Sequence, residues 1–184
     1  LFATWLSALL TLAATLVYVF VYTIGLKRNT PQNIVIGGAA GAFPPLIAWA
    51  AVTGDIGLGA VYLFAIVFFW TPPHFWALAL MIKDDYAEAG IPMLPVVKGD
   101  AATKKAIVLY VVLLLALTLM MLVTREVGWI YGIASACLGV GYLYYAIQLY
   151  RSEGILKAKP AYLYSLAYLA LLFVFVMIDA SVTI

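Results

Sequence analysis

The sequence predicts an all-α fold: a polytopic transmembrane helix bundle with six spans. Its 184 residues are 67% apolar and 10% charged, with a mean hydropathy of +1.11, whereas a soluble domain is nearer half apolar and a quarter charged. Six apolar runs are each long enough to cross a bilayer, which takes about 20 residues. All ten basic and eight acidic side chains lie between these runs or near their ends. This distribution is expected of spans, because a charge at mid-bilayer is costly.

In chain order the predicted spans are 3–24, 33–52, 57–82, 105–123, 127–149 and 161–182. No long polar linker, low-complexity tract or evident repeat divides them, so we expect residues 1–184 to form a single transmembrane domain. The chain begins at Leu1, inside an apolar run. We therefore expect a piece of a longer protein rather than a mature domain behind a signal peptide.

The connections between spans differ strongly in charge. The loops at 25–32, 83–104 and 150–160, with their flanks, hold nine basic residues, against Arg125 alone in the alternate connections. By the positive-inside rule these three loops face the cytoplasm or the mitochondrial matrix, and both chain ends face the other side. The net charge of +2 gives no indication of a nucleic-acid partner.

Several residue types near and within the spans predict packing and anchoring. Gly37, Gly38 and Gly41 would permit close helix approach. Cys137, the one cysteine, excludes an internal disulfide and is expected to be buried and inert. Tyrosines near span ends are typical of interface anchors: Tyr18, Tyr22, Tyr142, Tyr144, Tyr145, Tyr162 and Tyr164.

The loop at 83–104 is the longest connection and opens with an acidic cluster. Asp84, Asp85 and Glu88 fall within five positions. Asp84 and Glu88 would share a face if the preceding helix continued. Such oxygen donors suit Mg²⁺, which is usually held by one or two carboxylates plus substrate phosphates. The simpler alternative is a solvated helix end balanced by nearby lysines.

The loop at 25–32 has the complementary charge. Lys27 and Arg28 precede Thr30-Pro31, a pair typical of an N-cap and the first helical residue. The positive N-terminal end of the next helix would then point to the same membrane face, beside Asn33. We interpret this as an anion site suited to a diphosphate. Alternatively, the two basic residues only satisfy the positive-inside rule.

His74, the one histidine, is placed well inside a span. It follows Pro72-Pro73, which predicts a kinked helix. His74 and Asp85 are eleven residues apart, so on an unbroken helix they would face one way, about 16 Å apart, and line one cavity. The alternative is a structural histidine bonded to a neighbouring helix. A single histidine also excludes a cytochrome with two histidine axial ligands from this chain alone.

Three segments carry a resemblance to a known family: Tyr22–Gly38, Trp70–Trp76 and Lys83–Val97, the last with its Gly90-Ile91-Pro92-Met93-Leu94-Pro95 run. They resemble the haem O synthases, or protohaem IX farnesyltransferases, within the intramembrane aromatic prenyltransferase superfamily. The similarity extends over essentially the whole chain. It implies that the six spans correspond to the last six of nine. The family's first aspartate-rich motif, Asn-x-x-x-Asp-x-x-x-Asp, should lie upstream, so these residues alone would lack half the metal site and be inactive.

The resemblance also implies a reaction and its participants. Farnesyl diphosphate would prenylate a vinyl group of haem B to give haem O, in a bacterial plasma membrane or a mitochondrial inner membrane. Mg²⁺ would be the cofactor, and terminal-oxidase haem-maturation proteins would be partners. The implied catalytic residues are Asp85, Asp84, Lys27 and Arg28, the implied metal ligands are Asp85, Asp84 and Glu88, and the implied substrate contacts are His74, Asn33, Tyr86 and Lys83.

Three rival functions remain open. The first is a prenyltransferase acting on a quinone precursor or chlorophyllide. The second is a transporter with a midplane site at His74. Such folds use a pair of broken helices, whereas the sequence predicts one conspicuous break, at Pro72-Pro73. The third is a non-catalytic assembly or anchor subunit.

Overall fold

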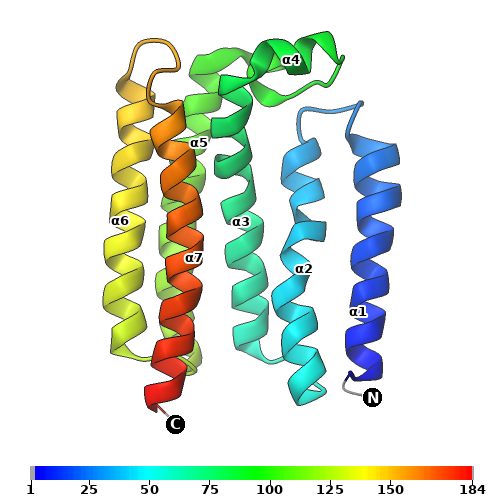
Figure 1. The fold of residues 1–184 in the computed structure, drawn as a ribbon, viewed down its shortest axis with the longest axis vertical. Coiled ribbons are helices and arrows are strands. Elements are labelled where there is room, and N and C mark those ends of the chain that lie inside the picture. The colour runs from blue at the N-terminus through cyan, green and yellow to red at the C-terminus, as the bar shows by residue number, and fades with distance from the viewer. Residues whose placement is uncertain (1–2, 184) are drawn as a thin grey trace.

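The computed structural model describes residues 3–183, and these form helices joined by short turns (Figure 1). The first helix, α1 (Trp5–Leu16), continues as a π-helical segment, Val17–Leu26. The remaining elements are α2 (Asn33–Thr53), α3 (Leu58–Met81), α4 (Lys83–Glu88), α5 (Leu94–Met120) with a 3₁₀ turn at Met121–Thr124, α6 (Trp129–Arg151) and α7 (Ala158–Thr183). Within the described residues, six helices are long and apolar enough to cross a membrane, so the predicted all-α fold and the number of spans are confirmed.

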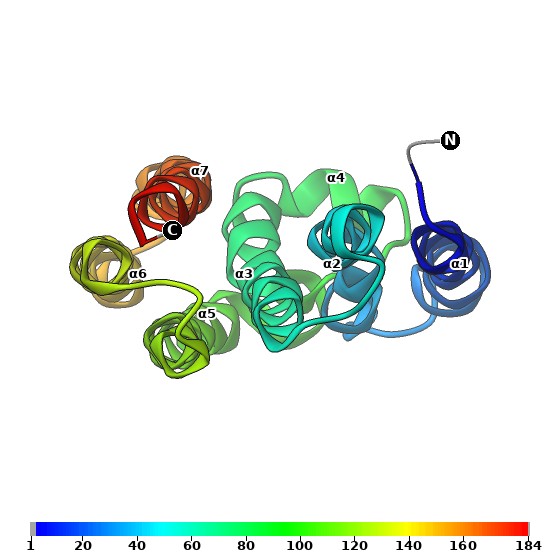
Figure 2. The same cartoon turned by 90° about the horizontal axis from the view of Figure 1, so that it is seen from below.

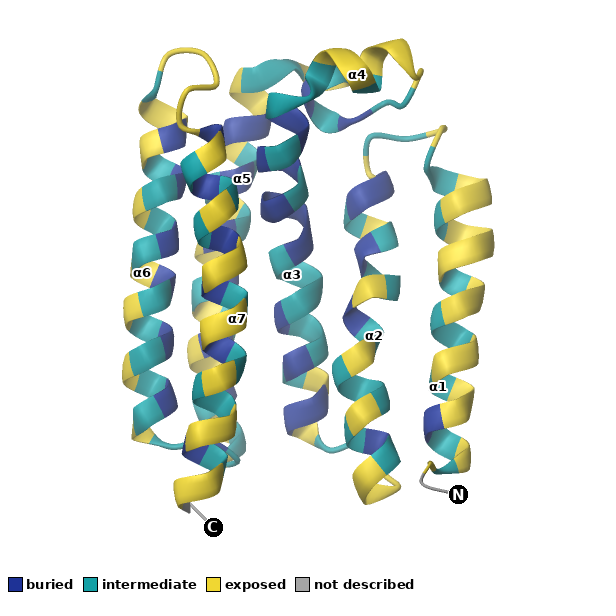
Figure 3. Cartoon of the chain, viewed as in Figure 1, coloured by how far each residue is buried: buried dark blue, intermediate teal, exposed yellow. Residues whose placement is uncertain are grey.

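The helix α3 occupies the centre of the bundle. Seen from below, α5, α6 and α7 group on one side of it and α1 and α2 lie on the other (Figure 2). Much of α3 is buried, whereas α1 exposes most of its surface (Figure 3). The main core lies between α3, α5, α6 and α7 and includes Ile66, Leu114, Tyr131 and Leu172. We attribute this burial to side chains of neighbouring helices interlocking along almost their whole length.

Two expectations about single residues on α6 are wrong. Tyr142 is not an interface anchor: it is 1% exposed and packs within the core against Tyr168. Cys137 is not buried, because it lies on the exposed outer face of α6. Aromatic and small apolar residues recur on both faces of this helix, so its hydropathy carries little information about which face points inward.

The three basic connections lie together at one end of the bundle, and both ends of the described chain lie at the other (Figure 1). This confirms the grouping that the charge distribution predicted.

The helix ends at the basic side differ from the sequence prediction. Helix α2 begins at Asn33 with Gln32 as its N-cap, two residues later than the Thr30 cap and Pro31 start that the sequence predicted. Thr30 still contributes locally, because its hydroxyl accepts a hydrogen bond from the Gln32 backbone N–H at 3.2 Å. Helix α3 stops at Met81, and Ile82 (φ −119°, ψ 37°) separates it from α4.

The expected long loop is largely helical. After α4 the chain turns at Gly90 (φ 65°) and enters α5 at Leu94, eleven residues before the predicted span. Gly99 has φ 78° inside this element, where the helix is interrupted by a kink. A left-handed φ is readily adopted by glycine alone, so Gly99 marks the bend between the part of α5 at the bundle end and the part that spans.

Candidate functional site

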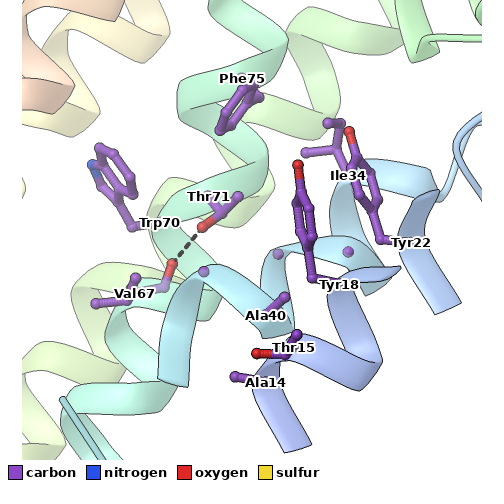
Figure 4. A pocket seen from close by; sticks show the side chains of 13 residues that line it. Ala14, Thr15, Tyr18, Tyr22, Ile34, Ala40, Val67, Trp70, Thr71 and Phe75 are labelled. Atoms are coloured by element: carbon purple, nitrogen blue, oxygen red, sulfur yellow. Dashed lines mark hydrogen bonds between the residues drawn. The ribbon is translucent and has the colours of Figure 1, made fainter. Parts of the chain in front are cut away.

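An apolar cavity of about 580 Å³ lies between the first three spans (Figure 4). Its volume falls in the usual range for small-molecule sites. Its upper end, nearest the basic connections, is formed by Tyr22, Ile34 and Phe75. Other lining residues come from mid-span on the same three helices: Ala14, Thr15, Tyr18, Gly37, Gly38, Ala40, Gly41, Val67, Trp70 and Thr71.

One wall of the cavity is built by the π-helical segment Val17–Leu26. Its bonds join residues five apart: the Lys27 N–H donates to the Tyr22 carbonyl at 2.8 Å, and the Thr23 hydroxyl donates to the Tyr18 carbonyl at 2.9 Å. Tyr18 and Tyr22 lie on this wall with ring centroids 5.8 Å apart. Because π-helical turns are rare and occur frequently at functional sites, this segment marks the cavity as a candidate site.

Two glycines of α2 let this wall and α3 approach closely. A Cβ atom added at Gly37 would overlap the Tyr22 ring, and one added at Gly38 would lie 3.1 Å from Thr71 Cγ2. The expected role of these glycines in close packing is therefore confirmed. Gly41 differs, because a Cβ there would meet nothing within 4 Å.

The cationic turn lies directly above the cavity. The Lys27 carbonyl accepts a hydrogen bond from Asn33 Nδ2 at 3.1 Å, which fixes the turn to the first residue of α2. Asn33 is 1% exposed, and its Oδ1 has no partner among the described residues. Neither Lys27 nor Arg28 forms an ion pair within residues 3–183, so both charges are free to meet an anion.

The acidic residues lie on α4 at the same end (Figure 1). Asp84, Asp85 and Glu88 are exposed, and within the described chain their carboxylates form neither an ion pair nor a hydrogen bond. Lys83 forms an ion pair with Asp100, because its Nζ lies 2.8 Å from Asp100 Oδ1. Helix α3 does not continue through these residues, because α4 is a new helix after the break at Ile82. Asp84 and Glu88 are four residues apart within α4, a spacing that puts them on one face of that helix.

A small apolar cluster holds α4 against the start of α2. Ile34, Ala79 and Met93 form its buried centre, and Tyr86 packs on it from α4. Partial burial raises the pKa of the Tyr86 phenol, which keeps this hydroxyl protonated and able to donate a hydrogen bond. Tyr86 is also close enough to Tyr22 for the two phenols to interact electrostatically. The cationic turn and the acidic helix therefore lie at the same end of the bundle, and the cluster around Ile34 connects α4 with the start of α2.

The described residues contain no group of three or more His, Cys, Asp or Glu side chains placed to hold a metal ion. The donor set on α4 nevertheless fits Mg²⁺ chemically. Asp84 and Asp85 are adjacent, exposed carboxylates that form no ion pair within the described chain, and Mg²⁺ prefers one or two such oxygens together with substrate phosphates and water. The metal-binding role of Asp84, Asp85 and Glu88 stays a prediction.

His74 does not line the cavity, nor does Asp85, so the expectation that both would line one cavity is wrong. The His74 ring is stacked between Trp70 and Tyr162, with ring centroids 4.3 and 4.8 Å away, and Nδ1 lies 2.7 Å from Ser165 Oγ. The Ser165 hydroxyl donates to the Tyr162 carbonyl at 2.5 Å, so it accepts its second bond from His74 Nδ1–H. His74 therefore supports Trp70, which forms the cavity wall.

The structure contains a second proline pair within a span, where the sequence prediction considered one. Helix α2 contains Pro44 and Pro45, and α3 contains Pro72 and Pro73, yet both helices continue through their prolines. The broken spans that a transporter reading requires are absent from α2 and α3. The midplane histidine that it requires is enclosed by aromatic rings.

A cavity was expected beside His74 and Asp85, but the residues that line the observed cavity were not predicted from the sequence. Tyr18 and Tyr22 were predicted to be interface anchors. Their spacing carried one usable signal: Tyr18, Tyr22, Gly37 and Gly41 recur at four-residue intervals on two consecutive spans. Large and small residues recurring on facing helices are compatible with a wall and the space beside it.

Within the described residues, unpaired cations, unpaired carboxylates and the upper end of an apolar cavity lie on one side of a helical membrane bundle, an arrangement suited to a substrate with an anionic head and an apolar tail. The chain matches the UbiA prenyltransferase family over residues 1–172 and belongs to that family. With its six spans, it is an integral membrane protein.

Its relatives narrow the comparison to one kind of prenyltransferase. The chain is 54% identical over 182 residues to the protoheme IX farnesyltransferase of Roseiflexus sp. (strain RS-1), covering 99% of this chain and 34% of that protein. It is 54% identical over 183 residues to that of Deinococcus radiodurans (96% of this chain, 58% of the relative) and 50% identical over 180 residues to that of Gloeobacter violaceus (97% and 59%). The chain thus spans less than two thirds of these relatives. No solved structure matches it.

Proposed function

We propose that the protein containing this chain transfers a farnesyl group from farnesyl diphosphate to a vinyl group of haem B, giving haem O. The observation that carries the proposal is that the unpaired cations Lys27 and Arg28 and the unpaired carboxylates of α4 lie at one end of the bundle, the end toward which the upper part of the apolar cavity points. A diphosphate joined to a long hydrocarbon has this same division of charge. The names of the relatives supply the acceptor.

The cationic turn would hold the diphosphate. Lys27 and Arg28 lie in the turn that follows the first span and leads into α2, and the positive end of the α2 dipole adds to their attraction for an anion. As the C–O bond to the isoprenoid breaks, the electron pair stays with the diphosphate, and these groups stabilise the growing negative charge. Mg²⁺ bound through Asp84, Asp85 and Glu88 would supply further neutralisation of that charge.

The cavity would hold the isoprenoid and protect the allylic cation from water. Its lining is mostly apolar, and Tyr18 and Tyr22 present aromatic rings beside it, which favour a nearby positive charge. The vinyl π electrons of haem B then attack the cationic carbon and form a C–C bond. Water adds to the resulting benzylic-type cation and loses a proton, which completes the hydroxyethylfarnesyl group.

The positive-inside rule places this end of the bundle at the cytoplasmic or matrix face of a bacterial plasma membrane or a mitochondrial inner membrane. The diphosphate would then arrive from the aqueous side, while the isoprenoid and haem would arrive through the lipid. A contact with terminal-oxidase haem-maturation proteins stays a prediction without structural support.

The test uses the purified full-length protein with haem B, farnesyl diphosphate and Mg²⁺, followed by mass analysis of the pigment. We expect haem O, and we expect Lys27→Gln/Arg28→Gln to lower kcat/KM for farnesyl diphosphate on the order of 100-fold, as for the loss of a transition-state donor. The matched control is Lys157→Gln/Lys159→Gln, which changes two basic residues at the start of α7, outside the cavity lining. If the protein prenylates a quinone precursor and not haem B when each is offered as the acceptor, the proposed acceptor is wrong. Equal losses in both double variants would remove the cationic turn from the mechanism.

A further inference from the structure

The cavity has an upper end near the basic connections, which we call its mouth, and a lower end within the membrane, which we call its floor. Ala14 and Thr15 of α1, Gly41 of α2 and Val67 of α3 contribute to its lining from the middle of their spans. Seven residues separate Ile34, near the mouth, from Gly41, so the two positions lie about 10 Å apart along α2. A hydrocarbon anchored by its diphosphate at Lys27 and Arg28 would extend down α2 toward Gly41.

Gly41 differs from the other two glycines that line the cavity. The Tyr22 ring occupies the space beside Gly37, and the Thr71 side chain occupies the space beside Gly38. An added Cβ atom at either glycine would push that neighbouring side chain away. At Gly41 an added Cβ would have no atom within 4 Å. Glycine is disfavoured within a helix relative to alanine, and no helix contact requires it here. What its missing side chain provides is space inside the cavity.

We propose that Gly41 determines the length of isoprenoid that the cavity accepts, by leaving open the floor that a side chain at this position would raise. This rests on the proposed function, because it assumes an isoprenoid diphosphate as donor. The polar head would be fixed at the mouth, so every added isoprene unit must find room at the opposite end. Gly41 lines the cavity and is exposed, and an added Cβ atom there would meet no atom within 4 Å, so a larger side chain would take up space that the isoprenoid would otherwise occupy.

The experiment compares geranyl, farnesyl and geranylgeranyl diphosphates as donors to haem B, using full-length wild type, Gly41→Ala and Gly41→Leu. We expect Gly41→Leu to reduce kcat/KM most for the C20 donor, less for C15 and least for C10. The C10-to-C15 ratio should rise by about tenfold or more, since single methylene groups in apolar pockets discriminate by that order. Gly41→Ala should give the same order with a smaller change, and it serves as the readout should the leucine variant fail to insert.

The matched control is Ala48→Leu, which adds bulk at an exposed position further along α2, outside the cavity lining. Its donor preference should equal that of wild type. A uniform loss for all three donors in both Gly41 variants, or the same ratio change in Ala48→Leu, would overturn the proposal. If wild type itself transfers no isoprenoid to haem, the proposed function fails. If wild type is active and the donor ratios do not move, only the role of Gly41 fails.

Discussion

The two ends of the bundle use their acidic side chains in opposite ways. At the end with the basic connections, Asp84, Asp85 and Glu88 are exposed and accept no hydrogen bond from the described chain. At the other end, Asp179 is 1% exposed and accepts a hydrogen bond from the backbone N–H of Gly128, the N-cap of α6. Glu126 Oε1 accepts from the Gly59 N–H at 3.3 Å, in the first turn of α3.

The difference separates structural charges from available ones. A carboxylate that caps a helix N-terminus satisfies backbone donors and interacts favourably with the helix dipole, so its charge is used within the fold. The carboxylates of α4 have no such partner, and close like charges repel one another unless a cation lies between them. At the end with the basic connections, unpaired cations and the unpaired carboxylates of α4 lie on the same side as the upper end of the apolar cavity, so we expect a charged ligand to bind there.

The largest effect is expected at Asp85. Changing Asp85 to Asn in the full-length protein should lower haem O formation by more than about 100-fold, because a carboxylate facing the diphosphate and its metal would lose its charge. Its thermal unfolding midpoint in detergent should not move, since the side chain is exposed and makes no internal contact. Asp100→Asn is the control from the same end. Full activity of Asp85→Asn would show that this residue is not part of the mechanism. It would also contradict the distinction between available carboxylates on α4 and structural carboxylates at the other end.

An intermediate effect is expected at Asp179, and on stability rather than turnover. Asp179→Asn keeps the shape but removes the charge at the start of α6, which should cost about 1–2 kcal/mol of unfolding free energy. The measurement is thermal unfolding in detergent, alongside haem O formation per folded molecule, which should stay at the wild-type value. Asp55→Asn is the comparison, because Asp55 is exposed at the same end and bonds only to the adjacent Ile56 N–H. Loss of turnover with unchanged stability would show that this end also serves catalysis.

The smallest effect is expected at the ion pair between Lys83 and Asp100. Both side chains are more than a third exposed, and exposed pairs contribute about 0–1 kcal/mol. Lys83→Met should therefore change the unfolding midpoint little and lower kcat/KM by less than about threefold, in keeping with a small interaction energy. A drop as large as that for the Lys27 and Arg28 variant would mean that Lys83 leaves Asp100 to bind the substrate, as the family resemblance implies.

The spans and their grouping could be predicted because burying a charge in lipid is so unfavourable that few charges interrupt the apolar runs. The segment after Met81 could not, because its local composition fits a loop as well as a short helix. Its form depends on Gly90 and Gly99 adopting left-handed φ angles and on Met93 packing against Ile34. Such contacts are between residues far apart in the chain, and local sequence does not specify them.

The candidate site was predictable in its charges and not in its cavity. Lys27, Arg28, Asp84 and Asp85 stood out because charged residues are few here and their loops fall on one face. The cavity lies between three helices, and its lining uses the same apolar and aromatic residue types as the rest of the spans, so no residue type marks it in the sequence. Tyr18 illustrates the difficulty, since a tyrosine near a span end fits an anchor at the lipid interface and a cavity wall equally well.

The π-helical end of the first span has a consequence for sequence variation. Its hydrogen bonds join residues five apart, one more than in an α-helix, so deleting a single residue between Val17 and Leu26 would let ordinary α-helical pairing resume with every backbone group still satisfied. The bilayer would tolerate that change, yet the tyrosine rings would turn by roughly 100° about the helix axis relative to the turn that follows. Relatives that differ here by one residue in length would keep the fold and enclose a differently shaped substrate.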